Sequence, residues 1–353
     1  MNHNSNQGSA TPLTGSPILL VPYMWIGDFV RCHTVVRLLR ARFPERPVDM
    51  LATTLCAPLT DYMPGVRRAV VVDLPRKRLA FRQHRALAER LKREGYGTAL
   101  ITLKTWKSAL APFLASIPER IGLFGEARLG ILSDVRFGRG KLPRMVDECA
   151  SLALPAGTPI PADWPAPELK VPESEVAAWR NARGVGANHP AVVLAPGAVG
   201  PAKRWPASAY AALARQLLAA GNAVWVVGGP AERPLAQAIV ADTDARDLTG
   251  TDLREAILAL AAATAAVSND SGLVHVAAAL GTPTIGIFGP TSPWHWAPLN
   301  PLAATIQANV ELACRPCHKP VCRYGHHRCM TEIGAEEVFA ATRRALAAAA
   351  PVA

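Results

Sequence analysis

A loop with the residue types of a phosphate site occupies residues 269–272 (NDSG). It follows an apolar segment typical of a buried strand and precedes a helix expected over residues 273–280. The first N–H groups of a helix and the positive end of its dipole attract anions. His275 lies one turn after Ser271 and can reach the same phosphate, although Asp270 or Ser271 could instead cap the helix, with His275 in the core. The residues expected at the phosphate are Asn269, Asp270, Ser271, Gly272 and His275.

Two other loops follow predicted strands and also suit an anion. Residues 289–293 (GPTSP) combine glycine with hydroxyl groups, which permits a close approach of the backbone. Pro196 and Gly197 end another predicted strand, and Lys203 and Arg204 follow a few residues later. Two cations beside a tight loop can neutralise a diphosphate leaving group without a metal. The three loops therefore predict a metal-independent diphosphate site.

One carboxylate follows the first predicted strand. Asp28 lies in a Gly-Asp loop before a helix expected from Phe29. It can accept a proton as a general base or cap the helix, and the two roles do not exclude each other.

Two further patterns have the spacing of a site but the wrong context. Asp242 and Asp244 match a metal-binding Asp-X-Asp, yet they lie in a polar stretch after a predicted helix, away from the expected strand ends. Gly184 and Gly186 precede a strand and not a helix, so they lack the context of a dinucleotide fingerprint. We interpret both as loops.

Four of the seven cysteines lie within sixteen residues. They are Cys314, Cys317, Cys322 and Cys329. In a chain expected to be intracellular, such a cluster favours a metal over disulfides, and tetrahedral zinc is the ordinary choice. A structural zinc site is the leading interpretation, with reduced free thiols, disulfides and an iron–sulfur centre as alternatives.

The loops require parallel strands that alternate with helices. Short apolar segments at residues 18–22, 48–51, 69–72 and 99–103 alternate with helical patterns, and the same alternation restarts at residue 191. Six prolines between residues 154 and 172 interrupt both patterns. We therefore expect an α/β protein with two Rossmann-like domains of mostly parallel sheets that face a central cleft.

The expected boundaries follow from these patterns. They are a disordered tail (1–16), an N-terminal Rossmann-like domain (17–153), a linker (154–172), a C-terminal Rossmann-like domain (173–334) with the cysteine cluster at 314–329, and a final helix (335–353) that could pack on either domain.

The chain carries a formal charge of +11, which indicates an anionic partner. Its aromatic content is only 6%, without the basic and aromatic alternation of a base-stacking surface, so we expect no nucleic-acid partner. Its longest apolar runs are shorter than the roughly 20 residues of a membrane span, and its start lacks the pattern of an export signal. We expect a cytoplasmic protein, and its charge gives weight to phosphorylated lipid at a membrane surface as the anionic partner.

In combination, four motifs resemble the ADP-heptose:lipopolysaccharide heptosyltransferases, especially their heptosyltransferase II branch. The motifs are WIGD (25–28), PGAVGPAKRWP (196–206), NDSGLVHVAAALGTP (269–283) and FGPTSP (288–293). The resemblance extends over nearly the whole chain from residue 18. It implies a GT-B glycosyltransferase that inverts the anomeric centre without a divalent metal. It also implies an acceptor-binding domain at residues 17–153, a nucleotide-sugar-binding domain at residues 173–334, and a peripheral location at the inner face of the inner membrane.

The resemblance also implies roles for individual residues. Asp28 would be the catalytic base, Lys203 would bind the donor phosphates, residues 270–272 with His275 would form the donor-phosphate loop, and Glu232 would bind the ribose. The segment 104–136 resembles the acceptor side of the family, and its candidate acceptor-binding residues are Lys104, Lys107, Arg120 and Arg128.

The partners implied are ADP-heptose and a lipid A-linked core oligosaccharide. A second basic group precedes this segment and suits an anionic membrane surface or a solvated face. It comprises Arg67, Arg68, Arg76, Lys77, Arg78, Arg82 and Arg85. Two alternatives remain open: an enzyme acting on another nucleotide sugar, such as an epimerase, and a basic nucleic-acid-binding module with a zinc knuckle.

Overall fold

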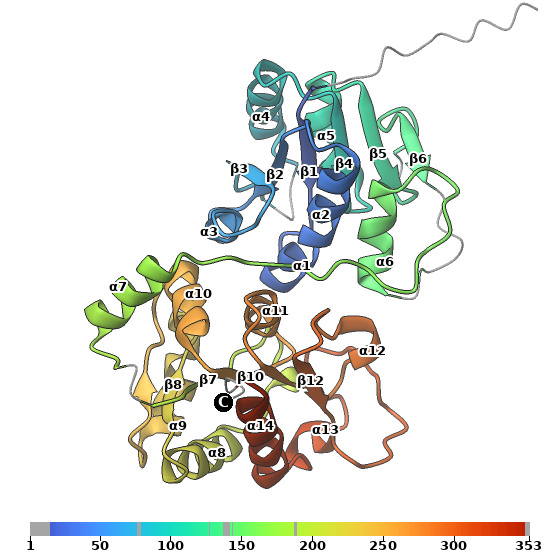
Figure 1. Ribbon diagram of the computed structural model, residues 1–353. Coiled ribbons are helices and arrows are strands. Elements are labelled where there is room, and N and C mark those ends of the chain that lie inside the picture. The colour runs from blue at the N-terminus through green and yellow to red at the C-terminus, as the bar shows by residue number, and fades with distance from the viewer. Residues whose placement is uncertain are drawn as a thin grey trace, which may run out of the picture.

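Two parallel sheets, each covered by helices, form the protein (Figure 1). The computed structural model describes residues 15–75, 79–126, 128–136, 142, 144–186 and 189–349. Within these residues, no helix is long and apolar enough to cross a membrane.

The N-terminal sheet has six strands in the order β3-β2-β1-β4-β5-β6, all parallel. This is the strand order of the Rossmann fold. Leu19 and Val21 pack into the core on one face of β1, and Ile18 and Leu20 pack into the core on the other face. The strand is therefore apolar at every position, as expected for a strand covered on both sides. The strands are β1 (Ile18–Val21), β2 (Val48–Ala52), β3 (Val66–Val71), β4 (Thr98–Ile101), β5 (Glu119–Leu123) and β6 (Asp134–Arg136).

Most helices of the N-terminal domain lie between successive strands, and α6 (Met145–Ala150) follows the last one. The helices are α1 (Ile26–Arg31), α2 (His33–Arg42), α3 (Ala57–Thr60), α4 (Phe81–Arg93), α5 (Trp106–Leu114) and α6 (Met145–Ala150), followed by the 3-10 helix η1 (Ser151–Ala153).

The C-terminal sheet repeats the same topology in the order β12-β11-β10-β7-β8-β9. Its strands are β7 (Ala191–Ala195), β8 (Ala223–Val226), β9 (Arg246–Asp247), β10 (Ala265–Asn269), β11 (Thr284–Ile287) and β12 (Ala303–Ile306). Its helices are α7 (Glu173–Arg183), η2 (Pro201–Lys203), α8 (Ala207–Ala219), η3 (Pro230–Glu232), α9 (Arg233–Val240), α10 (Leu253–Ala262), α11 (Gly272–Ala279), α12 (Pro293–Trp296), α13 (Arg328–Thr331) and α14 (Ala335–Ala349). The expectation of an α/β protein with two mostly parallel sheets is confirmed.

The last helix, α14, packs against the C-terminal domain, where it contacts α8, β10 and β11 (Figure 1). Val338 and Ala341 on this helix are buried in the same core as β7 and β11. Residues 154–172 contain no helix or strand and run between η1 and α7. They are held by side chains of α2, because Thr34 donates to the Pro165 carbonyl (2.9 Å) and Arg37 to the Ala166 carbonyl (2.7 Å).

The two domains meet where α1 packs on α11 (Figure 1). A glycine on each helix makes this approach possible. A Cβ at Gly27 would lie 2.6 Å from Cδ2 of His275, and a Cβ at Gly272 would lie 2.7 Å from Cβ of Ile26. Because α1 follows β1 and α11 follows β10, the carboxyl ends of the two sheets are brought together. A continuous buried core runs through both domains beside this contact.

Candidate active site

Ionisable side chains from both domains converge at the contact between α1 and α11. Asp28 is the third residue of α1, which begins at Ile26, and it is not the cap of a helix that begins at Phe29. Its carboxylate accepts from Nη1 of Arg31 at 3.1 Å and keeps 22% of its side-chain surface exposed. The capping alternative is therefore wrong in detail, because the helix starts three residues earlier than the sequence indicates. An aspartate in the first turn still interacts favourably with the helix dipole.

The surroundings of Asp28 make its carboxylate a better proton acceptor than an ordinary aspartate. Burial raises its pKa, the charge of Arg31 opposes this, Asp270 raises it further and Lys203 lowers it, with a net shift above the ordinary value of 3.8. A general base works best when its pKa lies closer to the working pH. A partly exposed carboxylate with a raised pKa meets this requirement.

Arg31 connects the two domains and was not among the residues expected from the sequence. Its side chain is only 4% exposed. One guanidinium nitrogen contacts Nε2 of His275 at 2.7 Å and the carbonyl of Trp296 at 2.5 Å, and the group lies 5.1 Å from the centre of the Trp296 ring. The one sequence signal for it is the spacing of three residues from Asp28 on a helix, which allows an ion pair.

His275 is neutral in this arrangement. The guanidinium of arginine can only donate, so Nε2 of His275 must accept and its proton lies on Nδ1. Burial, followed by the charges of Arg31 and Lys203, holds its pKa well below the ordinary 6.5. Its Nε2 is engaged by Arg31, so only the Nδ1–H is left to donate to a phosphate, and the role of His275 in binding one stays a prediction.

Asp270 joins two of the predicted anion loops. Its Oδ2 accepts from Nζ of Lys203 at 2.7 Å and from the hydroxyl of Thr291 at 2.7 Å. The Lys203 side chain is 30% exposed, whereas that of Asp270 is 7% exposed. The carboxylate thus holds Lys203 in front of the first turn of α11. An ammonium group has three donors, so Lys203 can keep Asp270 and still bind an anion.

Ser271 and Arg204 lie at the same loops. Ser271 is the N-cap of α11, but its hydroxyl contacts the hydroxyl of Ser268 at 3.1 Å and makes no side-chain cap bond, so the simple capping alternative does not describe it. Gly272 is the first residue of the helix. Arg204 donates through Nε to the Ala198 carbonyl at 3.2 Å and remains partly exposed. These three residues stay candidates for the donor site.

Asn269 is a structural link and does not bind a ligand through its side chain. The residue has no exposed surface. Its amide nitrogen donates to the Pro196 carbonyl (2.6 Å), and its oxygen accepts from the Trp205 backbone (3.1 Å) and the Tyr210 hydroxyl (3.2 Å). The prediction that it contacts a donor is corrected, because these bonds tie the ends of β7 and β10 together inside the protein.

Glu232 and Gly197 lie together, although they come from loops after different strands. A Cβ at Gly197 would lie 2.6 Å from Cγ of Glu232, so a larger residue would collide with the glutamate. The Glu232 carboxylate accepts from the Gly229 N–H at 3.0 Å and is partly exposed. The two residues that the sequence placed on the donor therefore form one surface.

Two candidate acceptor residues lie where a ligand could reach them. Lys104 follows β4, is 42% exposed and pairs with Glu148 at 2.7 Å. Lys107 is partly exposed in the first turn of α5.

The two candidate arginines are placed differently. Arg120 lies near the amino end of β5, and its guanidinium donates to the carbonyls of Ile117, Pro118 and Ile131. Arg128 is 2% exposed and donates to the Leu103 carbonyl. The acceptor prediction is corrected for Arg120, which is committed to backbone at the far end of the sheet. Arg128 is buried, but its Nε and Nη2 have no hydrogen-bond partner among the described residues, so its role stays a prediction.

The basic group at residues 67–85 is divided by the fold. Arg67 and Arg68 pair with the fully buried Asp49, at 2.6 and 3.2 Å, and have a structural role. Burial alone would raise the pKa of Asp49, but these arginines and Tyr96 bring it below the ordinary value. Arg82 and Arg85 are exposed on α4. Arg76, Lys77 and Arg78 lie outside the described residues.

The patterns interpreted as loops are loops in the structure. Asp242 and Asp244 are exposed in the turn between α9 and β9, at the amino end of the sheet. Gly184 ends α7 in the left-handed conformation (φ 58°), which favours glycine.

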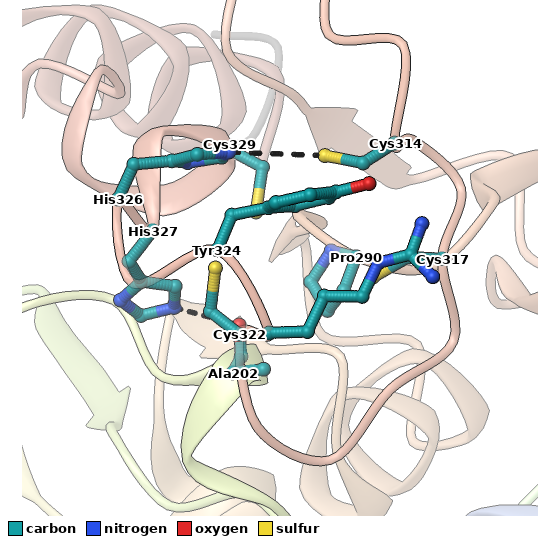
Figure 2. A pocket seen from close by; sticks show the side chains of 10 residues that line it. Ala202, Pro290, Cys314, Cys317, Cys322, Tyr324, His326, His327 and Cys329 are labelled. Carbon is teal, nitrogen blue, oxygen red and sulfur yellow. Dashed lines mark hydrogen bonds between the residues drawn. The ribbon is translucent and has the colours of Figure 1, made fainter.

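The four clustered cysteines form no disulfide and line one pocket (Figure 2). Across the described parts of the chain, no three His, Cys, Asp or Glu side chains are close enough together to hold a metal ion as they stand.

Comparison with known proteins gives a consistent result. The family described as Glycosyltransferase family 9 (heptosyltransferase) matches residues 84–327. Lipopolysaccharide heptosyltransferase 2 of Escherichia coli K12 is 35% identical over 338 residues, which cover 91% of this chain and 96% of that protein. Lipooligosaccharide heptosyltransferase 2 of Haemophilus ducreyi is 33% identical, covering 94% and 99%. The solved structure of E. coli ADP-heptose lps heptosyltransferase II superimposes with a TM-score of 0.82 at 33% identity and covers 94% of this chain and 99% of that one.

Replacement of Arg31 by glutamine should raise the pKa of Asp28, because it removes the largest influence that lowers this pKa. A carbon-13 NMR titration of the aspartate carboxyls, with the Asp28 signal assigned from an Asp28→Asn protein, measures the change. Arg40→Gln is the control, since Arg40 lies on α2 and donates to the Arg46 carbonyl, with no bond to Asp28. An unchanged Asp28 titration in Arg31→Gln would show that the ion pair does not set this pKa.

Proposed function

Because this chain belongs to glycosyltransferase family 9, the heptosyltransferase family, we propose that it transfers heptose from ADP-L-glycero-D-manno-heptose to a heptose of the lipopolysaccharide inner core. This is the activity of a heptosyltransferase II, the name carried by relatives that match over almost the full chain. The observation that supports the mechanism is the contact of α1 with α11. Through this contact, the Asp28 carboxylate of the N-terminal domain lies beside the first turn of α11 in the C-terminal domain.

Asp28 is the general base of the proposed reaction. It takes the proton from the acceptor hydroxyl as that oxygen attacks the anomeric carbon of the donor. The bond from the anomeric carbon to the β-phosphate oxygen breaks on the opposite face, its electron pair leaves with ADP, and the configuration is inverted. The raised pKa and partial exposure of Asp28 suit this step.

Lys203 and the first turn of α11 stabilise the departing diphosphate. Lys203 is already fixed by Asp270, so it needs no reorganisation when negative charge develops on the leaving oxygen. The helix N–H groups and the exposed part of Arg204 add to the positive potential. We propose that no divalent metal takes part, since Lys203 and α11 supply the positive charge that a metal would provide.

The remaining parts of the donor and acceptor are assigned by position. Glu232, which packs against Gly197, binds the ribose hydroxyls of ADP as a hydrogen-bond acceptor. Lys104 and Lys107, beside the carboxyl end of β4, face the phosphorylated core oligosaccharide. The exposed arginines of α4 bind to the anionic surface of the membrane in which the acceptor is anchored.

Asp28→Asn should lower kcat by about a hundredfold or more while the dissociation constant of ADP changes little, because the amide cannot accept the proton. Steady-state kinetics and calorimetry on the same preparations measure both. Asp163→Asn, an exposed aspartate of the linker, is the matched control and should leave kcat unchanged. A near-normal rate in stable Asp28→Asn protein would exclude this residue as the base.

Lys203→Ala should weaken ADP binding by about 1.5–3 kcal/mol, the range for a hydrogen bond to a charged group. Lys170→Ala, an exposed lysine of the linker, is the control in the same calorimetric titration. Activity should persist when EDTA is added directly to the assay. Activity that is lost in EDTA and restored by magnesium or manganese would instead assign a catalytic metal, with Asp242 and Asp244 as its first candidates.

The protein should cosediment with anionic vesicles and not with neutral ones, and binding should fade as salt is raised, because exposed charges are screened within about 8 Å at physiological ionic strength. Reversal of Arg82 and Arg85 to glutamate should weaken vesicle binding and raise the KM for the acceptor. Reversal of Arg343 and Arg344, exposed on α14, makes the same change in net charge on the other domain. Equal losses in both double variants would show a general charge effect and no specific surface.

A further inference from the structure

The cysteine pocket is lined by the ligand types that a soft cation prefers. Its walls include the thiols of Cys314, Cys317, Cys322 and Cys329, with His326 and His327 at the same pocket (Figure 2). Cys314 Sγ and His326 Nε2 are 3.9 Å apart. Four sulfur ligands are typical of structural zinc sites, which are tetrahedral and closed.

The charge of the surrounding segment fits a metal bound by four thiolates. Such a zinc centre carries a net charge of about −2, because each thiol loses its proton to solvent when it binds. Residues 314–329 contain no aspartate or glutamate, and four of them are arginine or lysine. These cations are Arg315, Lys319, Arg323 and Arg328. A segment of this composition compensates a dianionic centre.

The backbone around the thiols is held in conformations that carry a cost for side chains other than glycine. His318, directly after Cys317, has φ 52°, and His327, two residues before Cys329, has φ 49°. Strained backbone of this kind persists where the surroundings enforce it and is common at binding sites. The thiol side chains must still turn inward, since no three potential ligands of the described chain converge as they stand.

The same segment supports both donor loops from behind. On the first loop, Ala202 donates from its N–H to the Pro320 carbonyl at 3.0 Å, and the Ala202 carbonyl contacts Nε2 of His327 at 2.8 Å. On the second loop, the Pro290 carbonyl accepts from the N–H groups of Cys317 and His318, both at 3.0 Å. Ala202 and Pro290 also line the cysteine pocket itself.

These contacts lead directly to the donor site. Ala202 precedes Lys203, and Pro290 precedes Thr291, and both Lys203 and Thr291 bind the carboxylate of Asp270. A shift of the cysteine segment would therefore move two of the three groups of this cluster. We propose that Cys314, Cys317, Cys322 and Cys329 bind one zinc ion as thiolates, and that this zinc site fixes the loops of Lys203 and Thr291 and so sets the affinity for the nucleotide diphosphate.

The inference rests on the proposed function only in taking ADP as the ligand of Lys203, and its test needs no sugar transfer. Metal analysis of the full-length protein, purified under reducing conditions, should find about one zinc per chain. Removal of the metal with a mercurial reagent, followed by anaerobic thiol regeneration, should weaken ADP binding about tenfold or more in calorimetry, and added zinc should restore it. Cobalt in place of zinc should give the visible absorption of a tetrahedral thiolate complex.

Variants separate the metal site from the thiols in general. Cys322→Ser should lose the zinc and bind ADP about tenfold more weakly, whereas Cys56→Ser, a buried cysteine of the other domain, should retain both. The reversible removal and return of zinc in the unmodified chain keeps the test valid if Cys322→Ser fails to fold.

Any of four results would overturn the proposal. They are protein without bound metal and with four titratable thiols, disulfides within the cluster, iron in place of zinc, and unchanged ADP affinity after zinc removal. Tight, zinc-dependent ADP binding without heptose transfer would leave it standing and refute only the proposed reaction.

Discussion

The buried guanidinium of Arg31 fixes the two halves of the active site relative to each other. It holds Asp28 on its own helix and reaches His275 and the Trp296 carbonyl in the other domain. Removing one partner of a buried charged pair typically costs about 3–5 kcal/mol, because the other charge is left without compensation. Gly27 and Gly272 allow this contact, since a side chain at either position would separate the helices. Asp28 and α11 are therefore held together as one unit.

The electrostatics of this junction give its two carboxylates different tasks. Asp270 is buried and accepts from Lys203 and Thr291, so it serves to hold a cation. Asp28 has Arg31 as its ion-pair partner, stays partly exposed and has a raised pKa. Neutral His275 matters here, because a second cation beside Arg31 would lower the pKa of Asp28 and weaken it as a base.

The donor loops owe their positions to buried polar contacts behind them. Asn269 binds the Pro196 carbonyl, the Trp205 N–H and the Tyr210 hydroxyl, which joins the ends of β7 and β10 to the start of α8. The cysteine segment holds Ala202 and Pro290 in a similar way. Groups that are fixed before the ligand arrives stabilise a developing charge better than groups that must reorient. The packing of the C-terminal domain is thus part of its proposed chemistry.

The sequence by itself determined the α/β class, the restart of the pattern after the proline-rich segment, and the segments after strands that carry Asp28, Lys203 and Asp270. These features depend on residues a few positions apart, where strand and helix periodicity and the end of a strand are visible. Only the tertiary structure decided which polar side chains stay exposed and which are engaged inside the fold. Arg31 and His275 are 244 residues apart, and no local pattern reveals that they meet. Asn269, Arg120 and Arg128 have the polar groups of ligand-binding residues, but their hydrogen bonds go to backbone and side chains inside the fold. Burial and partner choice are properties of the packed chain, because they depend on what the rest of the sequence brings to each position.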